Sequence, residues 1–209
     1  MALYLRPVRF TATQAALKRS FDLLVAVPAL IVLLPLMAVI AGAIRSTSSG
    51  PVVFRQRRMT KNGRVFTMLK FRTMVADADQ APHPKVADLT EPFFKMRDDP
   101  RLTRIGYVLR KFSLDELLQL WNVVRGDMSL VGPRPLRIEQ IEADPELLEP
   151  RHEVKAGMTG WWQINGRSDV ELEDAVRLDL FYIDNWSLSL DLYILLKTVG
   201  VILLGKGAY

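Results

Sequence analysis

Residues 23–44 read LLVAVPALIVLLPLMAVIAGAI, 22 consecutive residues without a charge, bounded by Asp22 and Arg45. An α-helix of this length is about 33 Å long, enough to cross a hydrocarbon core of about 30 Å. The run is longer than the apolar part of a typical signal peptide, and no small-residue cleavage site is followed by a secreted-looking chain. The sequence therefore predicts a membrane helix over residues 23–44.

Basic residues lie on both sides of this run. Residues 1–72 contain 12 Lys and Arg against one acid, Asp22. A single-pass helix would leave one basic flank outside the cell, which the positive-inside tendency disfavours. Pro28 and Pro35 each remove a backbone donor and favour a kink. Two interpretations remain open: a re-entrant helix–break–helix with both ends on the cytoplasmic face, and a kinked single-pass anchor.

Length and composition exclude several kinds of site. The chain has 209 residues, 49% of them hydrophobic, which suits a single domain over residues 1–209. It has no cysteine, so disulfides, thiolate zinc sites and cysteine nucleophiles are excluded. Its two histidines, His83 and His152, disfavour a His-rich metal site. A hard cation held by carboxylates, such as Mg²⁺, is the favoured metal.

The net charge of +5 is an average of unlike parts. The basic first third indicates an anionic partner: phospholipid headgroups, phosphorylated substrates or nucleic acid. Residues 138–209, however, carry 13 acidic against 6 basic residues, and this excess repels a nucleic-acid backbone. We therefore expect no nucleic-acid partner. The sequence leaves homo-oligomerisation open.

The rest of the chain predicts an α+β, predominantly helical fold. Residues 52–70 are typical of two strands around a turn at Asn62-Gly63. Residues 188–204 are apolar but contain Asp191 and Lys197, which suits a helix that lies in the interface or packs on the membrane-facing side. The other expected elements are helices over residues 101–109 and 114–124, a loop-to-helix segment over 136–151, an amphipathic helix over 169–183, and a surface loop over 77–92.

Two adjacent acids follow a serine in the segment Ser113-Leu114-Asp115-Glu116. The spacing matches a capping box, with Ser113 as N-cap and Glu116 reaching back to it, and taken alone this role accounts for Glu116. Adjacent carboxylates ringed by cations are also suited to hold a divalent cation and a diphosphate, and an aspartate there is a candidate nucleophile toward phosphorus. The surrounding cations are Arg97, Arg101, Arg104, Arg110, Lys111, Arg125, Arg134 and Arg137.

Three further segments each have a functional and a structural interpretation. In Gly132-Pro133-Arg134-Pro135, the prolines restrict where Arg134 points; either Arg134 binds phosphate, or the segment is a rigid, solvent-exposed loop. Lys70 and Arg72 alternate onto one strand face, where they either meet phosphate or form a solvated edge. The tryptophans of residues 157–167 suit base stacking, membrane anchoring or core packing.

In this order, these pieces resemble the bacterial sugar transferases of the monotopic phosphoglycosyl transferase superfamily. The resemblance covers nearly the whole chain. Its most specific stretch is DDPRLTRIGYVLRKFSLDELLQLWNVVRGDMSLVGPRP, residues 98–135, and LKFRTM and GMTGWWQINGR resemble two other family blocks. The family often has Ser-Pro at its helix break, where this chain has Val27-Pro28.

The resemblance implies an enzyme at the cytoplasmic face of the bacterial inner membrane. Such enzymes transfer a sugar 1-phosphate from a UDP-sugar to polyprenyl phosphate, usually undecaprenyl phosphate, and release UMP. They use Mg²⁺ and a re-entrant membrane helix, and they begin the assembly of a glycoconjugate. The carry-over makes Asp115 the nucleophile and Glu116 its partner acid, both near the metal. Lys70, Arg72, Arg110, Arg134 and Arg137 are expected to bind substrate, and Asp22 and Pro28 to shape the membrane helix.

The main rival to this interpretation is a non-catalytic membrane adaptor whose basic first third binds anionic lipid. It accounts for the apolar run and its flanks. It assigns no role to the acids at Asp115 and Glu116 or to their arginines. Release of UMP from UDP-sugars by the purified protein would distinguish the two.

Overall fold

The computed structural model describes residues 10–78, 99–165 and 171–203. Within these ranges the fold is mostly helical, as the sequence predicts, and it contains two short sheets. The predicted surface loop at 77–92 lies almost entirely outside the described residues. So do His83, Arg97 and the segment Gly166-Arg167 at the end of the tryptophan loop.

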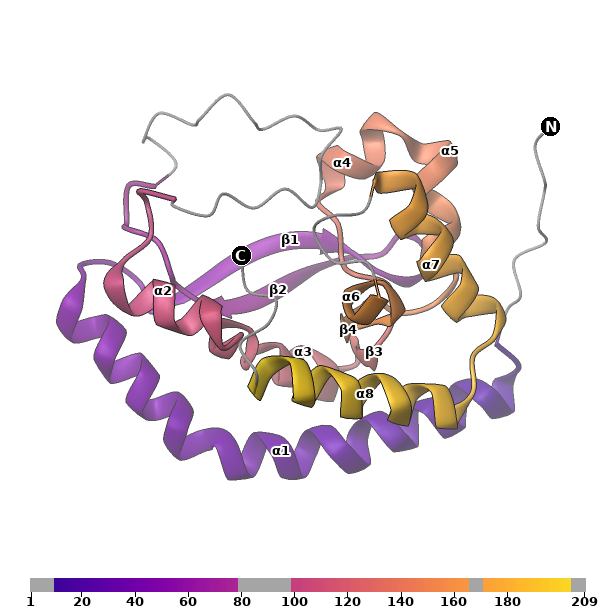
Figure 1. Cartoon of the computed structure of the whole chain (residues 1–209), viewed down its shortest axis with the longest axis horizontal. Coiled ribbons are helices and arrows are strands. Elements are labelled where there is room, and N and C mark those ends of the chain that lie inside the picture. Colours follow the sequence, from indigo (N-terminus) through magenta and orange to yellow (C-terminus); the bar gives the residue numbers. More distant parts are fainter. Residues whose placement is uncertain (1–9, 79–98, 166–170, 204–209) are drawn as a thin grey trace.

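One long helix, α1 (Ala12–Thr47), lies along one side of the molecule (Figure 1). A capping box starts it: the Thr11 side chain accepts from the Gln14 N–H, and the Gln14 side chain accepts from the Thr11 N–H. Among the described helices it is the one long and apolar enough to cross a membrane, by length and composition. The predicted helix over residues 23–44 is confirmed, and it extends beyond both predicted ends.

The chain stays helical through Pro28 and Pro35. Figure 1 shows α1 bowed, with its concave side toward the rest of the molecule. A proline removes one backbone donor, so a helix can bend there while its other hydrogen bonds persist. The structure therefore has a curved continuous helix where a break was expected. Its outer side is strongly apolar and exposed, through Leu24, Val27, Ile31, Val32, Leu34, Leu36 and Val39.

The predicted hairpin is confirmed as strands β1 (Val53–Met59) and β2 (Val65–Phe71). They pair antiparallel, from Val53 opposite Phe71 to Met59 opposite Val65. A short turn of 3₁₀ helix, η1 (Lys61–Gly63), joins them, and Asn62 takes a left-handed conformation there (φ 57°). Asn and Gly tolerate positive φ, which explains the turn signal at this point of the sequence.

The central segment packs on the hairpin. It consists of α2 (Arg104–Lys111), η2 (Leu114–Glu116) and α3 (Gln119–Arg125). The fully buried Asn122 of α3 joins the two layers. Its side chain donates to the Thr67 carbonyl (2.8 Å) and accepts from the Leu69 N–H (3.0 Å). Because β2 exposes these groups at its free edge, Asn122 takes the place of a third strand at this point.

The last third adds a sheet that the sequence did not predict. Strands β3 (Ser129–Val131) and β4 (Gly157–Thr159) pair in parallel, and a Cβ on Gly157 would lie 2.1 Å from the Gly132 nitrogen. Strands this short show no alternation in the sequence. The remaining helices are α4 (Ile138–Ala143), α5 (Pro145–Leu148), η3 (Glu149–Glu153), α6 (Trp161–Asn165), α7 (Leu172–Asp184) and α8 (Leu188–Leu203). The helices expected at 169–183 and 188–204 are thus confirmed.

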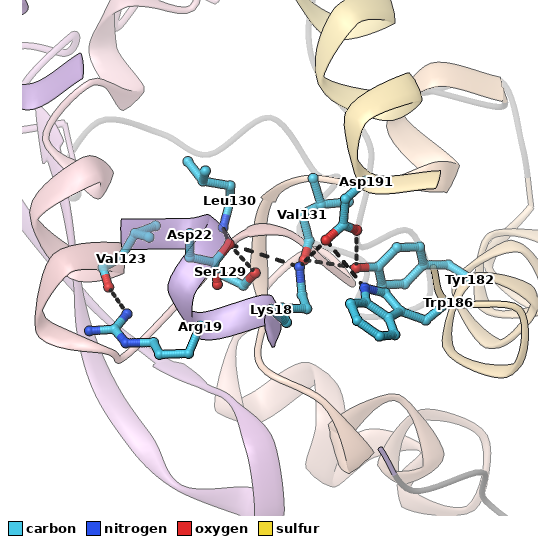
Figure 2. A network of polar contacts seen from close by, with 10 residues as sticks. All are labelled: Lys18, Arg19, Asp22, Val123, Ser129, Leu130, Val131, Tyr182, Trp186 and Asp191. Atoms are coloured by element: carbon cyan, nitrogen blue, oxygen red, sulfur yellow. Dashed lines mark hydrogen bonds and ion pairs between the residues drawn. The ribbon is translucent and has the colours of Figure 1, made fainter. Parts of the chain in front are cut away.

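A buried polar network attaches the first half of α1 to the body (Figure 2). The Lys18 ammonium donates to Asp191 of α8 at 2.7 Å, and both side chains are buried. Asp191 also accepts from the Tyr182 hydroxyl (2.7 Å) and the Trp186 indole (3.2 Å). Asp22 accepts from the Ser129 hydroxyl and the Leu130 N–H of β3. Four elements, α1, β3, α7 and α8, are therefore held at one point.

Replacing Asp191 with alanine is expected to destabilise the protein strongly. The change removes the closer partner of the buried Lys18 and leaves it only the weaker contact with Asp22 at 3.9 Å. Breaking a buried pair in this way typically costs about 3–5 kcal/mol. Asp174→Ala is the matched control, because it breaks the Arg177–Asp174 pair, whose side chains are 74% and 55% exposed. Its expected cost is within about 0.5 kcal/mol. Unfolding in detergent measures both, and equal losses would contradict a special role for the buried pair.

Candidate active site

The two adjacent acids lie in η2, the tight connection between α2 and α3. Asp115 is buried and Glu116 half-buried. Ser113 has a left-handed backbone (φ 53°) and makes no capping hydrogen bond with its side chain. The predicted capping box is therefore wrong. The sharp turn that leads from α2 into η2 takes the N-cap serine out of the extended conformation that a capping box requires.

Cations from two neighbouring elements reach these acids. Lys70, near the end of β2, donates from its ammonium to Glu116 at 2.6 Å. Arg110, near the end of α2, donates to the Thr73 hydroxyl at 3.1 Å. Burial lowers the pKa of Arg110, and the negative charges of Asp115 and Asp99 oppose that effect. Lys70 and Arg110 therefore lie beside the carboxylates, as the sequence predicts.

The close approach of α2 to the β2 exit explains how these groups converge. A Cβ on Gly106 of α2 would lie 1.9 Å from the Thr73 carbonyl oxygen, so only glycine fits there. Thr103 caps α2 by accepting from the Gly106 N–H, while its own N–H donates to the Thr73 carbonyl. These contacts fix α2 against the end of β2 and bring Arg110 alongside Lys70.

Arg58 of β1 is a site residue that the sequence analysis missed. Its pKa is lowered to about 9, mainly by burial and in addition by the nearby charges of Arg134 and Arg137. Glu139 and Glu116 act in the opposite direction. Arg58 therefore belongs to the same charged cluster as Glu116. In the sequence it was only one of several basic residues after the apolar run, and its contacts come from residues far along the chain.

Arg134 and Arg137 lie close enough to Arg58 for their charges to lower its pKa. The Arg134 guanidinium lies over the Trp162 ring, with its central carbon 6.0 Å from the ring centre. Trp162 is buried and Trp161 stacks on Phe181, so core packing is confirmed for this tryptophan pair. Arg137 is exposed at the start of α4. The interpretation of this loop as solvent-exposed is wrong, because Pro133 and Pro135 are buried and Arg134 is half-buried.

The contacts of Arg72 argue against its predicted role in binding substrate. Its guanidinium donates to the carbonyls of Ser48 and Ser49 and to the Ser48 hydroxyl. Ser48 is the C-cap residue of α1. The prediction placed Lys70 and Arg72 on one strand face by alternation. In the structure β2 ends at Phe71, and the Arg72 guanidinium binds the carbonyls that α1 leaves unpaired at its C-terminal end.

The described residues contain no group of three His, Cys, Asp or Glu side chains able to hold a metal ion. Mg²⁺ does not require one, because it is usually bound by one or two carboxylates together with substrate phosphates and water. Asp115 and Glu116 supply two adjacent carboxylates, with Lys70 and Arg110 beside them. This donor set fits the predicted metal.

Comparison with known proteins points to one family. A model described as "Bacterial sugar transferase" matches residues 13–205. The exopolysaccharide production protein ExoY of Sinorhizobium fredii is 42% identical over 92% of this chain and 88% of its own length. The UDP-galactose-lipid carrier transferase of Erwinia amylovora is 43% identical, and the undecaprenyl-phosphate galactose phosphotransferase of Salmonella typhimurium is 40% identical. Each covers 92% of this chain, which spans only 42% of their lengths.

Acidification is expected to destabilise the protein through His152 of η3. Burial lowers its pKa to about 4, and the charge of Arg151 contributes. Between about pH 6.5 and pH 4 the unfolded chain therefore binds a proton that the folded chain does not. The temperature of the unfolding midpoint should therefore decrease as the pH is lowered through this window. The decrease should be smaller in His152→Gln. Identical profiles for the two proteins would contradict the assignment.

Proposed function

Because the chain belongs to the bacterial sugar transferase family, we propose that it transfers a sugar 1-phosphate from a UDP-sugar to polyprenyl phosphate, with release of UMP. The chain is thus a transferase, and its relatives' names support undecaprenyl phosphate as the acceptor. The observation that carries the proposal is the Asp115–Glu116 pair, ringed by Lys70, Arg110 and Arg58 from three different elements. The reaction would begin the assembly of a polysaccharide or another glycoconjugate.

The proposed chemistry has two steps. A carboxylate oxygen of Asp115 attacks the phosphorus that bears the sugar, and the bond from that phosphorus to the bridging oxygen breaks, so UMP leaves. An oxygen of polyprenyl phosphate then attacks the same phosphorus and displaces Asp115, which regains its free carboxylate. Dividing the reaction avoids a direct encounter between two anionic substrates. The product is polyprenyl diphosphate sugar.

The cations of the site have distinct positions for this task. Arg110 is placed to offset charge beside Asp115, where the phosphosugar forms. Lys70, now paired with Glu116 at 2.6 Å, can exchange this carboxylate for a phosphate oxygen. Arg134 would bind the nucleotide phosphate. When bound by Asp115 and Glu116, Mg²⁺ would supply further positive charge to the diphosphate.

The fastening of α1 supports a re-entrant position at the cytoplasmic face. Lys18 is paired with Asp191 near one end of the helix, and Arg72 binds the backbone just past the other. Between these ends, Met37 and Ile40 are buried against the body. A helix crossing perpendicular to the bilayer would draw this charged body into hydrocarbon, at a large cost. A helix that dips in and returns keeps the site at headgroup level, where polyprenyl phosphate presents its phosphate.

Asp115→Asn is expected to abolish UMP release, by at least about 1,000-fold, because the amide cannot form the phosphosugar intermediate. The assay incubates purified protein with Mg²⁺, a panel of UDP-sugars and undecaprenyl phosphate. Asp174→Asn, at an exposed site on α7, is the matched control and should retain activity. Full activity in Asp115→Asn would contradict the nucleophile assignment. Absence of UMP from wild type with every donor would favour the adaptor hypothesis.

Both flanks of the membrane helix are expected on the cytoplasmic side. The chain has no native cysteine, so Arg9→Cys and Lys61→Cys each provide a single labelling position. In intact cells, a membrane-impermeant maleimide that reaches the periplasm should label neither variant. Both should react after lysis, which is the control for accessibility. Labelling of one variant alone in intact cells would restore the single-pass anchor.

A further inference from the structure

The loop that carries Arg134 is held by its backbone from three directions. Four consecutive carbonyls, those of residues 133–136, accept hydrogen bonds from outside the loop. The donors are Gly157 N–H to Pro133 (2.9 Å), Arg151 to Arg134 (3.0 Å), Arg58 to Pro135 (3.1 Å) and Met59 N–H to Leu136 (3.5 Å). Two of the four donors, Arg58 and Arg151, are arginine side chains.

Arg151 holds the loop from the protein interior. It is 1% exposed and pairs with Asp179 of α7, which is equally buried. Its Nε donates to Asp179 at 2.8 Å, and its Nη2 donates to both Asp179 and the Arg134 carbonyl. Burying an ion pair is costly, and apolar side chains of similar volume often stabilise a fold better. The hydrogen bond from Arg151 to the Arg134 carbonyl holds the loop, and apolar residues could not make it.

Arg58 holds the loop from the side of the active site. Its Nη1 donates to the Pro135 carbonyl, while its Nε and Nη2 both donate to the Gln56 side chain (3.2 and 2.6 Å). This geometry uses the fixed fork of the guanidinium, which one ammonium group cannot reproduce. Arg58 keeps this position close to two other arginines, Arg134 and Arg137, despite their repulsion.

The side chain of Arg134 is restricted as well. Prolines before and after it limit the backbone, and Trp162 supplies an aromatic face beneath its guanidinium. With backbone and side chain both constrained, little conformational freedom is left to lose on binding. Such preorganisation raises affinity because the ordering cost is met during folding.

We propose that Arg58 and Arg151 are positioning residues that hold the Pro133–Leu136 loop from opposite sides and aim Arg134 before substrate arrives. The proposal rests on the proposed function, in which Arg134 binds the phosphates of the nucleotide sugar. It assigns Arg58 and Arg151 no direct contact with substrate. Each therefore acts on the reaction only through Arg134, and this dependence is measurable.

The test is a double-mutant cycle on UMP release, with KM for the UDP-sugar and kcat measured separately. Arg58→Lys and Arg151→Lys keep the charge but not the fork. Each should raise KM about tenfold in the wild-type background and change kcat less. In an Arg134→Ala background the same substitutions should change KM less than about twofold, because no guanidinium remains to be aimed.

A control and a second variant make the cycle decisive. Arg177→Lys changes an arginine in the exposed pair with Asp174 and should leave KM unchanged. If Arg151→Lys does not fold, the same comparison of KM is made with Arg58→Lys alone, because Arg58 is only half-buried. Equal increases in KM with and without Arg134 would overturn the proposal, because they would show direct binding or a general structural role. An active wild type with unchanged KM in Arg134→Ala would overturn this inference alone, whereas an inactive wild type overturns the proposed function with it.

Discussion

The rest of the structure depends on how an apolar helix is fastened to a charged body. The Lys18–Asp191 pair, with Tyr182 and Trp186 around it, is the interaction that does so (Figure 2). It joins residues 173 positions apart in the sequence, so α1 and α8 must meet before the fold is complete. Because the pair is buried, the joint is resistant to salt, unlike the exposed charges of the same surface.

The site is organised by an imbalance of charge. Two carboxylates face cations drawn from β1, β2, α2 and the loop after β3. Several of these cations already have protein partners, such as Glu116 for Lys70 and the Thr73 hydroxyl for Arg110. These partners satisfy the cations when no substrate is present. Under the proposed function, an anionic substrate replaces or joins these partners.

Local patterns predicted much of the fold. Alternation and the Asn62-Gly63 turn indicated the hairpin, and apolar periodicity indicated α7 and α8, because these signals arise within single elements. The β3–β4 sheet joins residues nearly thirty positions apart and leaves no such signal. Ser113 matched a capping box, but tertiary packing of α2 imposed a left-handed turn there.

The same limit applies to the site. Asp115, Glu116, Lys70 and Arg110 were named from residue type and family blocks, and the structure brings them together. Arg72 was predicted to bind substrate and Arg58 was not predicted at all. The sequence does not indicate whether an arginine binds a backbone carbonyl or a phosphate. Only the position of the α1 exit and of the Pro135 carbonyl distinguishes the two cases.

The side chain of Asn122 has a consequence for how this protein behaves outside its membrane. A two-stranded sheet has two open edges, and an open edge invites pairing with a strand of another molecule. By binding both Thr67 and Leu69, Asn122 occupies the middle of the β2 edge with a side chain that no second copy can extend. In a protein that is extracted with detergent and carries an exposed apolar helix, one of the two edges at which this sheet could aggregate is therefore blocked.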